Sequence, residues 1–363
     1  MIAIITDIHF GYKNNHKQRF EETMSFFGQQ FFPYIYQNKI KHVLCAGDIF
    51  DSRTTIDWWI LDQLKERFFK WFDEHDVKLH IAIGNHDVYR KDAIDTNAFN
   101  HILNDNPNCI AYSSISTIEI GKYIIGMIPW QVKPKETVFP IADILVTHSE
   151  LKGFSFTKGI ESKEGYTEED FKDYKLILNG HMHIKSTKGK LVNIGNPFQK
   201  DWGDFNEDKG FYVLGDNFDL TFIHNEICPK HVKILYDNLT GHYTAYGYKE
   251  HELDITEKTA IEIAKNNYVK LIYKGGMTKG LDKLHQAMLL VSKNNEKIEL
   301  IDASEVVEIC DSKELEENIK QDASPIKVID SYVDSLILVD GIDKEKLNEC
   351  METLYKEVSV YEI

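Results

Sequence analysis

The sequence has little cysteine, no long apolar run and no excess of positive charge, and each of these absences excludes a class of protein. The five cysteines among 363 residues are odd in number and form no CxxC pair. This argues against a zinc ribbon or a disulfide framework and is typical of reduced thiols in a cytoplasm. No apolar run approaches the roughly 20 residues of a membrane span, and the opening "MIAIITDIHF" lacks the basic region of a signal peptide. We therefore expect a cytoplasmic protein without a membrane partner.

The net charge is −16, which argues against a protein that coats DNA unaided. The acidity is uneven, because residues 1–230 carry −6, residues 231–300 carry +1 and residues 301–363 carry −11. The middle of the chain can therefore approach a polyanion, whereas the C-terminal part should be repelled by one.

Short apolar stretches alternate with longer amphipathic stretches through about residue 225. This pattern predicts an α/β fold in which two sheets form a four-layer β-sandwich flanked by helices. Helices are expected over 18–38 and 56–75. Strands are expected at 2–6, 42–47, 79–84, 118–129, 142–148, 176–183, 190–197 and 210–216.

The pattern changes in the last third of the chain. Residues 267–302 have the pattern strand, turn, helix, strand of a small α+β module, and the acidic remainder is mostly helical. The expected domains are therefore residues 1–228, 229–302 and 303–363.

Polar residues follow nearly every early strand, and their types are those of metal ligands. They are Asp7 and His9, Asp48 and Asp51, Asn85 to Asp87, His148, and His181 and His183. Residues at i and i+2 of an extended chain point to the same side, so Asp7 with His9 and His181 with His183 should each converge. Carboxylate, imidazole and amide oxygen suit Mn²⁺, Fe²⁺ or Zn²⁺. Each piece alone is a weak signal, but five in order at strand ends predict a metal site.

The order D-x-H, GDxxD, GNHD, H, GHxH resembles that of the calcineurin-like metallophosphoesterases. Within that family, the stretches "GDIFDSR", "MIPW", "HSELKGFSFTKG" and "NIGNPFQ" are most similar to the SbcD-type DNA-repair exonuclease subunits in their bacteriophage form. The similarity of motifs covers roughly residues 1–215. It implies a nuclease domain at 1–228, a DNA-binding cap at 229–302 and a tail at 303–363 that binds an SbcC-type ATPase. It also implies host cytoplasm as the location.

The resemblance further implies a site of two Mn²⁺ ions, with Mg²⁺ or other divalent ions as alternatives. Asp7, His9, Asp48 and His183 would hold the first ion, and Asp48, Asn85, His148 and His181 the second. A hydroxide shared by the two ions would attack the phosphodiester. His86 would not be a ligand; it would stabilise charge on the phosphate and protonate the leaving oxygen.

Asp51 departs from the pattern of the archaeal and eukaryotic relatives, which have a histidine at this position. The role of that histidine in handling DNA cannot be carried over. By similarity to the protein phosphatases, Asp51 would hydrogen-bond His86 and set its tautomer. The alternative is that Asp51 caps the following helix, and the sequence leaves both open. Asp87 is likewise either a partner of the site or a turn residue.

Other features give weaker signals. Lys152 and Lys158 follow His148, and Lys185 and Lys188 follow the GHMH motif, so each is a candidate phosphate contact as well as an ordinary surface lysine. The helix expected over 56–75 is apolar on more than one side, which predicts either full burial or an interface, and a homodimer through this helix is expected.

Three functions are open on these grounds. The leading one is an Mn²⁺-dependent DNA nuclease that acts with the ATPase as a 3′→5′ exonuclease on duplex DNA and an endonuclease on single strands. The second is a stand-alone metallophosphoesterase acting on phosphoproteins or nucleotides, against which "GDIFDSR" argues because protein phosphatases have GDxxDRG there. The third is an inactive scaffold for the ATPase, against which the full set of seven expected ligands argues.

Overall fold

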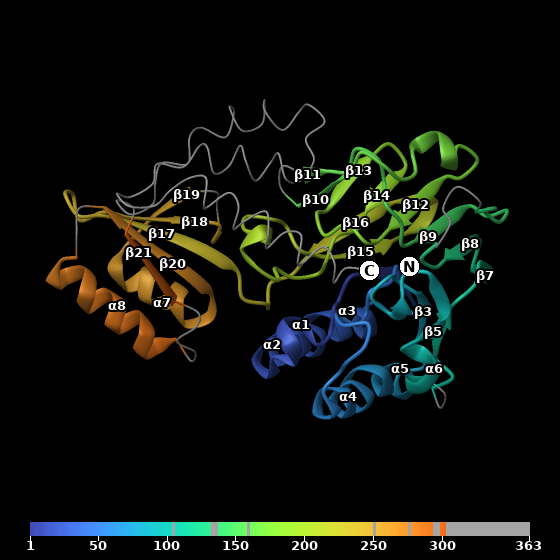
Figure 1. Ribbon diagram of the computed structural model, residues 1–363, viewed down its shortest axis with the longest axis horizontal. Coiled ribbons are helices and arrows are strands. Elements are labelled where there is room, and N and C mark those ends of the chain that lie inside the picture. Colours follow the sequence, from blue (N-terminus) through green and yellow to red (C-terminus); the bar gives the residue numbers. More distant parts are fainter. Residues whose placement is uncertain are drawn as a thin grey trace, which may run out of the picture. The chain divides into compact units, whose positions relative to one another are not determined.

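The computed structural model describes residues 1–302 apart from 104–105, 132–136, 158–159, 250–251, 275–276 and 293–297. The predicted helical tail over 303–363 therefore lies outside the described residues. The chain divides into two compact units, Met1–Val232 and Lys233–Ile363, which Figure 1 shows in ribbon form. None of the described helices combines the length and the apolar character that crossing a membrane requires.

The first sheet of unit 1 has six strands in the order β16-β15-β1-β2-β3-β6. They are β1 (Ile2–Ile5), β2 (His42–Cys45), β3 (Lys78–Ala82), β6 (Cys109–Tyr112), β15 (Gly210–Leu214) and β16 (Leu220–His224). The four strands from β1 to β6 run parallel, with Ile5 opposite Cys45 and Cys45 opposite Ile81. β15 and β16 are antiparallel additions at one side.

The second sheet of unit 1 also has six strands, in the order β13-β14-β12-β9-β8-β7. They are β7 (Ser116–Ile120), β8 (Tyr123–Ile128), β9 (Ile144–Thr147), β12 (Leu176–Asn179), β13 (Ser186–Lys188) and β14 (Leu191–Asn193). β8, β9, β12 and β14 run parallel. β7 and β8 form the hairpin predicted over 118–129, and Gly121 adopts a positive φ of 59° at its turn.

An apolar core joins the two sheets, because one buried cluster contains Ile4 and Leu44 of the first sheet together with Val146 and Leu178 of the second. The other face of the first sheet packs on phenylalanine-rich helices. The other face of the second sheet is covered by residues of 151–174, which contribute Leu151, Phe154, Tyr166 and Phe171. The predicted mixed α/β fold class is confirmed. Helices were expected on the outer face of both sheets. Among the described residues, the outer face of the second sheet is instead covered by loops, a hairpin and a short 3₁₀ helix.

The two predicted long helices are present, and a π-helical turn interrupts each. The first consists of α2 (Lys17–Phe26), the π turn Phe27–Phe31 and α3 (Phe32–Gln37). The second consists of α4 (Trp58–Leu64), the π turn Lys65–Phe69 and α5 (Lys70–Glu74).

The second of these helices buries most of its apolar surface inside unit 1. Leu64 and Phe72 are fully buried, and Phe32 stacks on Trp71 with ring centroids 4.2 Å apart. Trp58, however, is 80% exposed at the first residue of α4. Burial in the core therefore explains most of the apolar character that the sequence shows, and a small exposed remainder is left for an interface.

Short elements complete unit 1. They are α1 (Tyr12–Asn15), β4 (Val88–Arg90), β5 (Ala93–Asn97), α6 (Phe99–Ile102), β10 (Ser155–Thr157), β11 (Ile160–Glu161) and the 3₁₀ turns Glu168–Phe171, Trp202–Asp204 and Asp216–Phe218. β4 and β5 form a hairpin directly after the GNHD motif, which the sequence did not predict.

The second unit contains a five-stranded sheet in the order β19-β18-β17-β20-β21. Its elements are β17 (His231–Asp237), β18 (Tyr243–Tyr246), β19 (Glu252–Ile255), α7 (Glu257–Asn266), β20 (Tyr268–Lys274), α8 (Lys279–Val291) and β21 (Ile298–Asp302). The strand, helix and strand expected over 267–302 correspond to β20, α8 and β21. The three preceding strands and α7 were not predicted individually.

Candidate metal centre

The predicted ligands all follow parallel strands at their carboxyl ends. Asp7 follows β1, Asp48 follows β2 and Asn85 follows β3 in the first sheet, whereas His148 follows β9 and His181 follows β12 in the second. Parallel neighbours end at the same edge of a sheet, so each sheet gathers its ligands at one edge. Packing the two sheets together then brings the two edges into contact.

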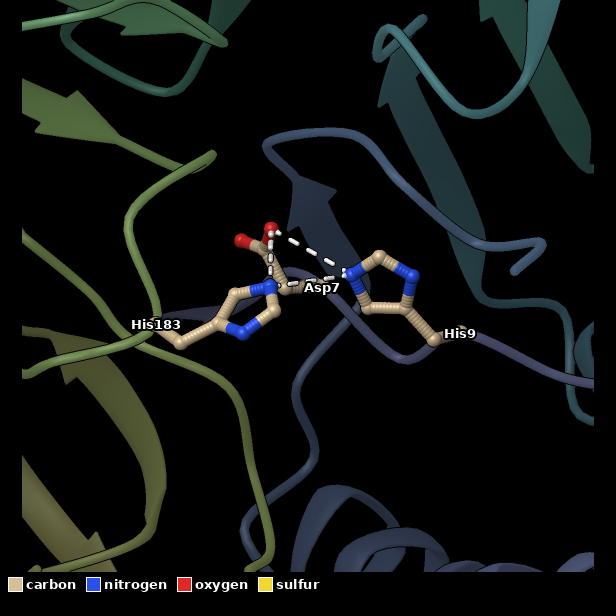
Figure 2. A group of neighbouring side chains, drawn as sticks. All are labelled: Asp7, His9 and His183. Atoms are coloured by element: carbon tan, nitrogen blue, oxygen red, sulfur yellow. Dashed lines mark hydrogen bonds and ion pairs between the residues drawn. The ribbon is translucent and has the colours of Figure 1, made fainter. Parts of the chain in front are cut away.

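Asp7, His9 and His183 form the first ligand group (Figure 2). The Nε2 atoms of His9 and His183 each lie 3.7 Å from Asp7 Oδ1 and 3.2 Å from each other. Figure 2 shows the three side chains pointing toward a common centre from two separate loops. Asp7 and His9 are buried, and the side chain of His183 is 32% exposed, so the group is open on the side of His183.

Asp48, His148 and His181 form the second ligand group, and Asn85 joins it. Asn85 Oδ1 lies 3.0 Å from His148 Nε2 and 2.8 Å from His181 Nδ1. His148 Nδ1 lies 2.6 Å from the carbonyl oxygen of Ala46. A carbonyl only accepts, so Nδ1 carries a proton and Nε2 is the nitrogen left to bind an ion once it is deprotonated.

Asp48 lies between the two groups. Its Oδ2 is 3.2 Å from His148 Nε2 of the second group and 3.8 Å from His9 Nε2 of the first. Its Oδ1 accepts a hydrogen bond from the backbone N–H of His86 at 2.8 Å. One carboxylate is thus positioned by backbone and faces both groups.

Four of the seven predicted ligands adopt left-handed backbone conformations. The φ angles are 51° for Asp7, 52° for His9, 51° for Asp48 and 76° for His181. Such conformations cost about 1–3 kcal/mol each in a non-glycine residue and collect at functional sites. His181 and His183 consequently diverge into different groups, so the extended-chain expectation that they converge is wrong. Asp7 and His9 do converge, although neither is extended.

Glycines before the ligands are required by close packing. A Cβ atom on Gly84 would collide with the carboxylate and backbone nitrogen of Asp48, and one on Gly180 would collide with Thr6 and with the carbonyl of Ala46. At Gly84 the loops after β2 and β3 of the first sheet approach as closely as backbone allows, and at Gly180 a loop of the second sheet approaches the first sheet in the same way.

The donor set fits divalent cations. Asp7 Oδ1 is a fully buried carboxylate oxygen with no hydrogen-bond partner, and a buried polar atom without a partner needs an explanation. It faces the Nε2 atoms of two histidines at 3.7 Å. Carboxylate, imidazole and amide oxygens around a common centre are the ligands that Mn²⁺, Fe²⁺ and Zn²⁺ accept.

His86 lies next to the ligands without joining either group. Its ring is 5.0 Å from that of His9, centroid to centroid. Its Nδ1 lies 2.6 Å from the backbone carbonyl oxygen of Asp51. Nδ1 must therefore carry a proton, which makes Nε2 the atom that can exchange one. Burial lowers the pKa of His86.

Asp51 does hydrogen-bond His86 and place the proton on its Nδ1, but it does so through the backbone carbonyl oxygen and not through the carboxylate. The alternative, that Asp51 caps the following helix, differs from the structure, because the cap of α4 is Asp57, whose side chain accepts from Trp59 N. The carboxylate Oδ1 of Asp51 instead lies 3.4 Å from His9 Nδ1 and 3.7 Å from Lys200 Nζ. Asp51 thus lies on the Nδ1 side of the His9 ring, opposite to Nε2, where a metal-binding imidazole usually has a carboxylate partner, but the two side chains do not form a hydrogen bond.

Asp87 is a partner of the site's backbone. Its buried carboxylate accepts from the N–H of Phe50 at 3.1 Å and of Gly84 at 2.9 Å, which ties the loop after β3 to that after β2. Burial and the neighbouring Asp48 raise its pKa to about 7.

The predicted DNA-binding lysines are distributed around the second sheet. Lys185 Nζ contacts Asp208 at 3.2 Å and lies 3.9 Å from the centroid of the Phe222 ring. Lys188 Nζ donates to the Gly153 carbonyl. Lys152 is exposed, and Lys158 lies outside the described residues. Their contact with DNA stays a prediction.

Two cations near the ligand groups, Lys200 and Arg53, were not predicted. Lys200, whose side chain is 8% exposed, faces Asp51 and lies 4.9 Å from the centroid of the Tyr12 ring. Arg53 donates from Nε to the carbonyl oxygen of Asn85 at 2.8 Å. The only sequence signal for Arg53 was its place at the end of the stretch "GDIFDSR", and the only one for Lys200 was its place directly after "NIGNPFQ".

Buried amides hold the ligand loops of the second sheet, and these too were missed. Asn193 Nδ2 donates to the carbonyls of Met182 and Ile184, at 2.6 Å each, on both sides of His183. Asn179 Nδ2 donates to Asn193 Oδ1 at 3.0 Å, and Asn179 Oδ1 accepts from Ser149 N at 3.1 Å. The available signal was an asparagine at the end of each of two apolar strands.

Lys209 also stabilises the loop that carries His183. Its buried ammonium group donates to the carbonyl of His183 at 2.9 Å and pairs with Asp204 Oδ1 at 2.7 Å. A cation without water around it needs such a partner, so the pair and the loop stabilise one another.

The comparison with protein families decides where this geometry belongs. The calcineurin-like phosphoesterase family matches residues 1–185, which contain every ligand of both groups. The chain belongs to the calcineurin-like phosphoesterase family. The resemblance inferred from the motifs is confirmed, and the protein is a metal-dependent phosphoesterase.

Two curated relatives match beyond the family domain. "Exonuclease subunit 1" of enterobacteria phage T4 is 27% identical over 337 residues, which are 91% of each chain. "DNA double-strand break repair protein Mre11" of Nanoarchaeum equitans is 24% identical over 246 residues, 59% of this chain and 66% of that protein. Among solved structures, the Pseudomonas putida nuclease MPE covers 53% of this chain and 66% of its own at 14% identity, but a TM-score of 0.26 carries no argument.

Proposed function

We propose that this chain is the Mn²⁺-dependent nuclease subunit of an SbcCD-type complex, a 3′→5′ exonuclease on duplex DNA and an endonuclease on single strands. The observation that carries the proposal is the position of Asp48. Its Oδ2 lies 3.2 Å from His148 Nε2 and 3.8 Å from His9 Nε2, so one carboxylate oxygen faces both ligand groups. A shared carboxylate is what a pair of ions acting on one phosphodiester needs.

Each ion has a complete set of donors in this proposal. The first would be held by Asp7, His9, Asp48 and His183, and the second by Asp48, Asn85, His148 and His181. When bound, two such ions lower the pKa of water and neutralise charge on the phosphate oxygens. Mn²⁺ is proposed because the set mixes hard oxygen donors with imidazoles.

His86 is the proposed proton donor. Its Nδ1–H donates to the carbonyl oxygen of Asp51 at 2.6 Å, which holds the ring in place and directs Nε2 away from that carbonyl. A protonated Nε2 would give its proton to the oxygen that leaves phosphorus. Lys200 and Arg53 add positive charge beside the ligand groups, which favours a phosphodiester over a neutral ester.

DNA as substrate is supported by the two curated relatives, an exonuclease subunit and a double-strand break repair protein. The net charge of −16 supports a partner, because such a chain gains little affinity from phosphates by itself. We propose that residues 229–302 contact DNA and that residues 303–363, which lie outside the described part of the chain, dock on the SbcC-type ATPase. The proposed homodimer would use the exposed start of the helix that begins at Trp58.

The nuclease assay is direct. Purified protein with Mn²⁺ is incubated with a duplex labelled at the 5′ end of one strand, a labelled single strand, and a phosphopeptide. A ladder that shortens from the 3′ end, lost on chelation and restored by Mn²⁺, is expected on the duplex. Release of phosphate from the peptide without cleavage of either DNA would overturn the nuclease in favour of a protein phosphatase.

The partner is tested by co-expression with a tagged SbcC-type ATPase from the same genome. The full chain should be retained on the tagged ATPase, and a chain that ends at residue 319 should not be, although it keeps its metal and its Mn²⁺-dependent cleavage. Retention of the shortened chain at full strength would overturn the tail as the docking element.

A further inference from the structure

Two aromatic rings lie against the second ligand group. Trp130, two residues after β8, has its ring centroid 5.2 Å from that of His181 and 6.4 Å from that of His148. Phe156, in β10, has its centroid 5.5 Å from that of His181 at an interplanar angle of 85°. His181, a predicted metal ligand, is thus in contact with two aromatic rings that come from different segments of the chain.

The Trp130 ring is held by two hydrogen bonds. Its backbone N–H donates to the carbonyl of Ile83 at 2.7 Å, directly before the GNHD motif. Its indole Nε1–H donates to the carbonyl of Lys91 at 3.1 Å, at the tip of the β4–β5 hairpin. The indole is therefore oriented before any ligand arrives, which lowers the entropic cost of stacking on it.

Both rings are half-buried, and Phe156 packs in part against the nearby core cluster. Phe154 and Phe171 of the same region are 2% and 0% exposed, whereas Trp130 and Phe156 keep part of their surface in solvent. Solvent-exposed aromatic surface beside a site for a phosphodiester offers contact to the flat, apolar part of a nucleotide.

We infer that Trp130 and Phe156 form a stacking site for the nucleobase next to the scissile phosphodiester. The inference rests on the proposed nuclease function and assigns to it a preference for base-bearing nucleotides over the bare sugar–phosphate chain. Stacking on an aromatic side chain tolerates every base, so the site selects nucleotides without reading their sequence. It also accounts for Trp130 of "MIPW" and Phe156 of "GFSF", which metal binding does not need.

The test measures a ratio of rates. Wild-type protein with Mn²⁺ cleaves, under single-turnover conditions, DNA that carries either a normal nucleotide or a tetrahydrofuran abasic residue beside the scissile bond, on each side in turn. Base-bearing DNA should be cleaved faster by about 5- to 150-fold, the range that stacking of one base on an aromatic side chain gives.

The variants separate stacking from support of His181. Trp130→Leu and Phe156→Leu keep apolar volume against His181 but remove the aromatic ring, so each should lower the ratio toward one. Trp130→Phe should keep most of it. Tyr36→Ala removes an aromatic side chain that is 68% exposed on α3 and should leave the ratio at its wild-type value. Bound metal is measured for every variant.

The outcomes are distinguishable. An equal fall in both rates in the leucine variants, with the ratio preserved, would overturn the inference and make the rings supports of His181. If the wild type cleaves base-bearing and abasic DNA at the same rate, the stacking site is overturned, whereas the proposed nuclease function is kept. Cleavage of neither would overturn the nuclease proposal and this inference with it.

Discussion

The ligand loops of the two sheets are held by different means. In the first sheet, the loops after β1 and β2 continue side by side through backbone hydrogen bonds, from Asp7 N to Gly47 O at 3.0 Å and from His9 N to Asp48 O at 3.1 Å. In the second sheet, backbone bonds also occur, from Gly180 N to Thr147 O at 2.9 Å and from Asn196 N to His183 O at 3.3 Å, but the buried amides of Asn179 and Asn193 add several side-chain hydrogen bonds to the loop carbonyls. The bonds between the loops after β1 and β2 survive a change of side chain, whereas the carbonyls on both sides of His183 lose a donor when Asn193 is replaced.

The two sheets also differ in the donors they supply. The first contributes two carboxylates, an amide oxygen and one imidazole, whereas the second contributes three imidazoles. Negative charge is therefore concentrated on one side of the site and proton-binding nitrogen on the other. Substitutions on the two sides should therefore differ in their effects on metal binding, cleavage and stability. The predictions below test that difference.

Asp48→Ala should have the largest effect. It removes the one carboxylate that faces both groups, so metal and cleavage should disappear together, while the backbone hydrogen bonds of its loop keep the protein folded. Metal analysis together with circular dichroism measures this. Asp216→Ala, whose parent side chain is 93% exposed, is the control. Two ions still bound per chain in Asp48→Ala would remove Asp48 from its bridging position.

His86→Ser should lower cleavage by about 10²- to 10⁴-fold, the scale of a positioned proton donor, with bound metal unchanged. The backbone N–H that holds Asp48 is kept in this variant, because only the imidazole is lost. Single-turnover rates and metal content are measured beside His101→Ser, an exposed histidine of α6. Loss of metal would instead make His86 a ligand, and an unchanged rate would remove it from the chemistry.

Asn193→Ala tests the side-chain tie of the second sheet. It leaves the carbonyls of Met182 and Ile184 without their donor, so metal affinity should fall about 10- to 100-fold and the free energy of unfolding by about 1–3 kcal/mol. Metal titration and urea unfolding are compared with Asn100→Ala, an exposed asparagine of α6. Wild-type affinity in Asn193→Ala would mean that the second-sheet loops, like the first, are held by backbone alone.

The smallest effect is the release of one proton when the second group takes up metal. Burial lowers the pKa of His148, but the Asp48 carboxylate outweighs this and raises that pKa to about 9, so His148 is protonated at pH 7 without metal. A ligand nitrogen must be deprotonated, and affinity should therefore rise with pH up to about 9. His183 contributes no proton, because burial and Lys200 lower its pKa to about 3.

Calorimetry of Mg²⁺ binding at pH 7 in buffers of different ionisation enthalpy measures that proton. The apparent enthalpy should depend on the buffer in the wild type and lose this dependence in His148→Gln. An undiminished dependence in His148→Gln would assign the proton to another group.

Much of the fold was accessible from the sequence because the strands are short, apolar and parallel. Residues 2–6, 42–47 and 79–84 each end in a polar cluster, and that coincidence predicted both the strand and the ligand that follows it. The β4–β5 hairpin and β17 to β19 escaped prediction because their alternation is weak and partly polar. Half-buried strands of that kind resemble loops in sequence.

The sequence by itself determined the kinds and order of the ligands, since these depend only on which residue follows each strand. The tertiary structure decided which ligands share an ion. His181 and His183 are two residues apart and belong to different groups, because a φ of 76° at His181 turns the chain. The tertiary structure also decided that the Asp51 carboxylate lies beside His9, that Lys200 lies close to Asp51 and that Trp130 contacts His181. The direction of a side chain from a loop follows the backbone angles and the packing around it, and neither is local to the sequence.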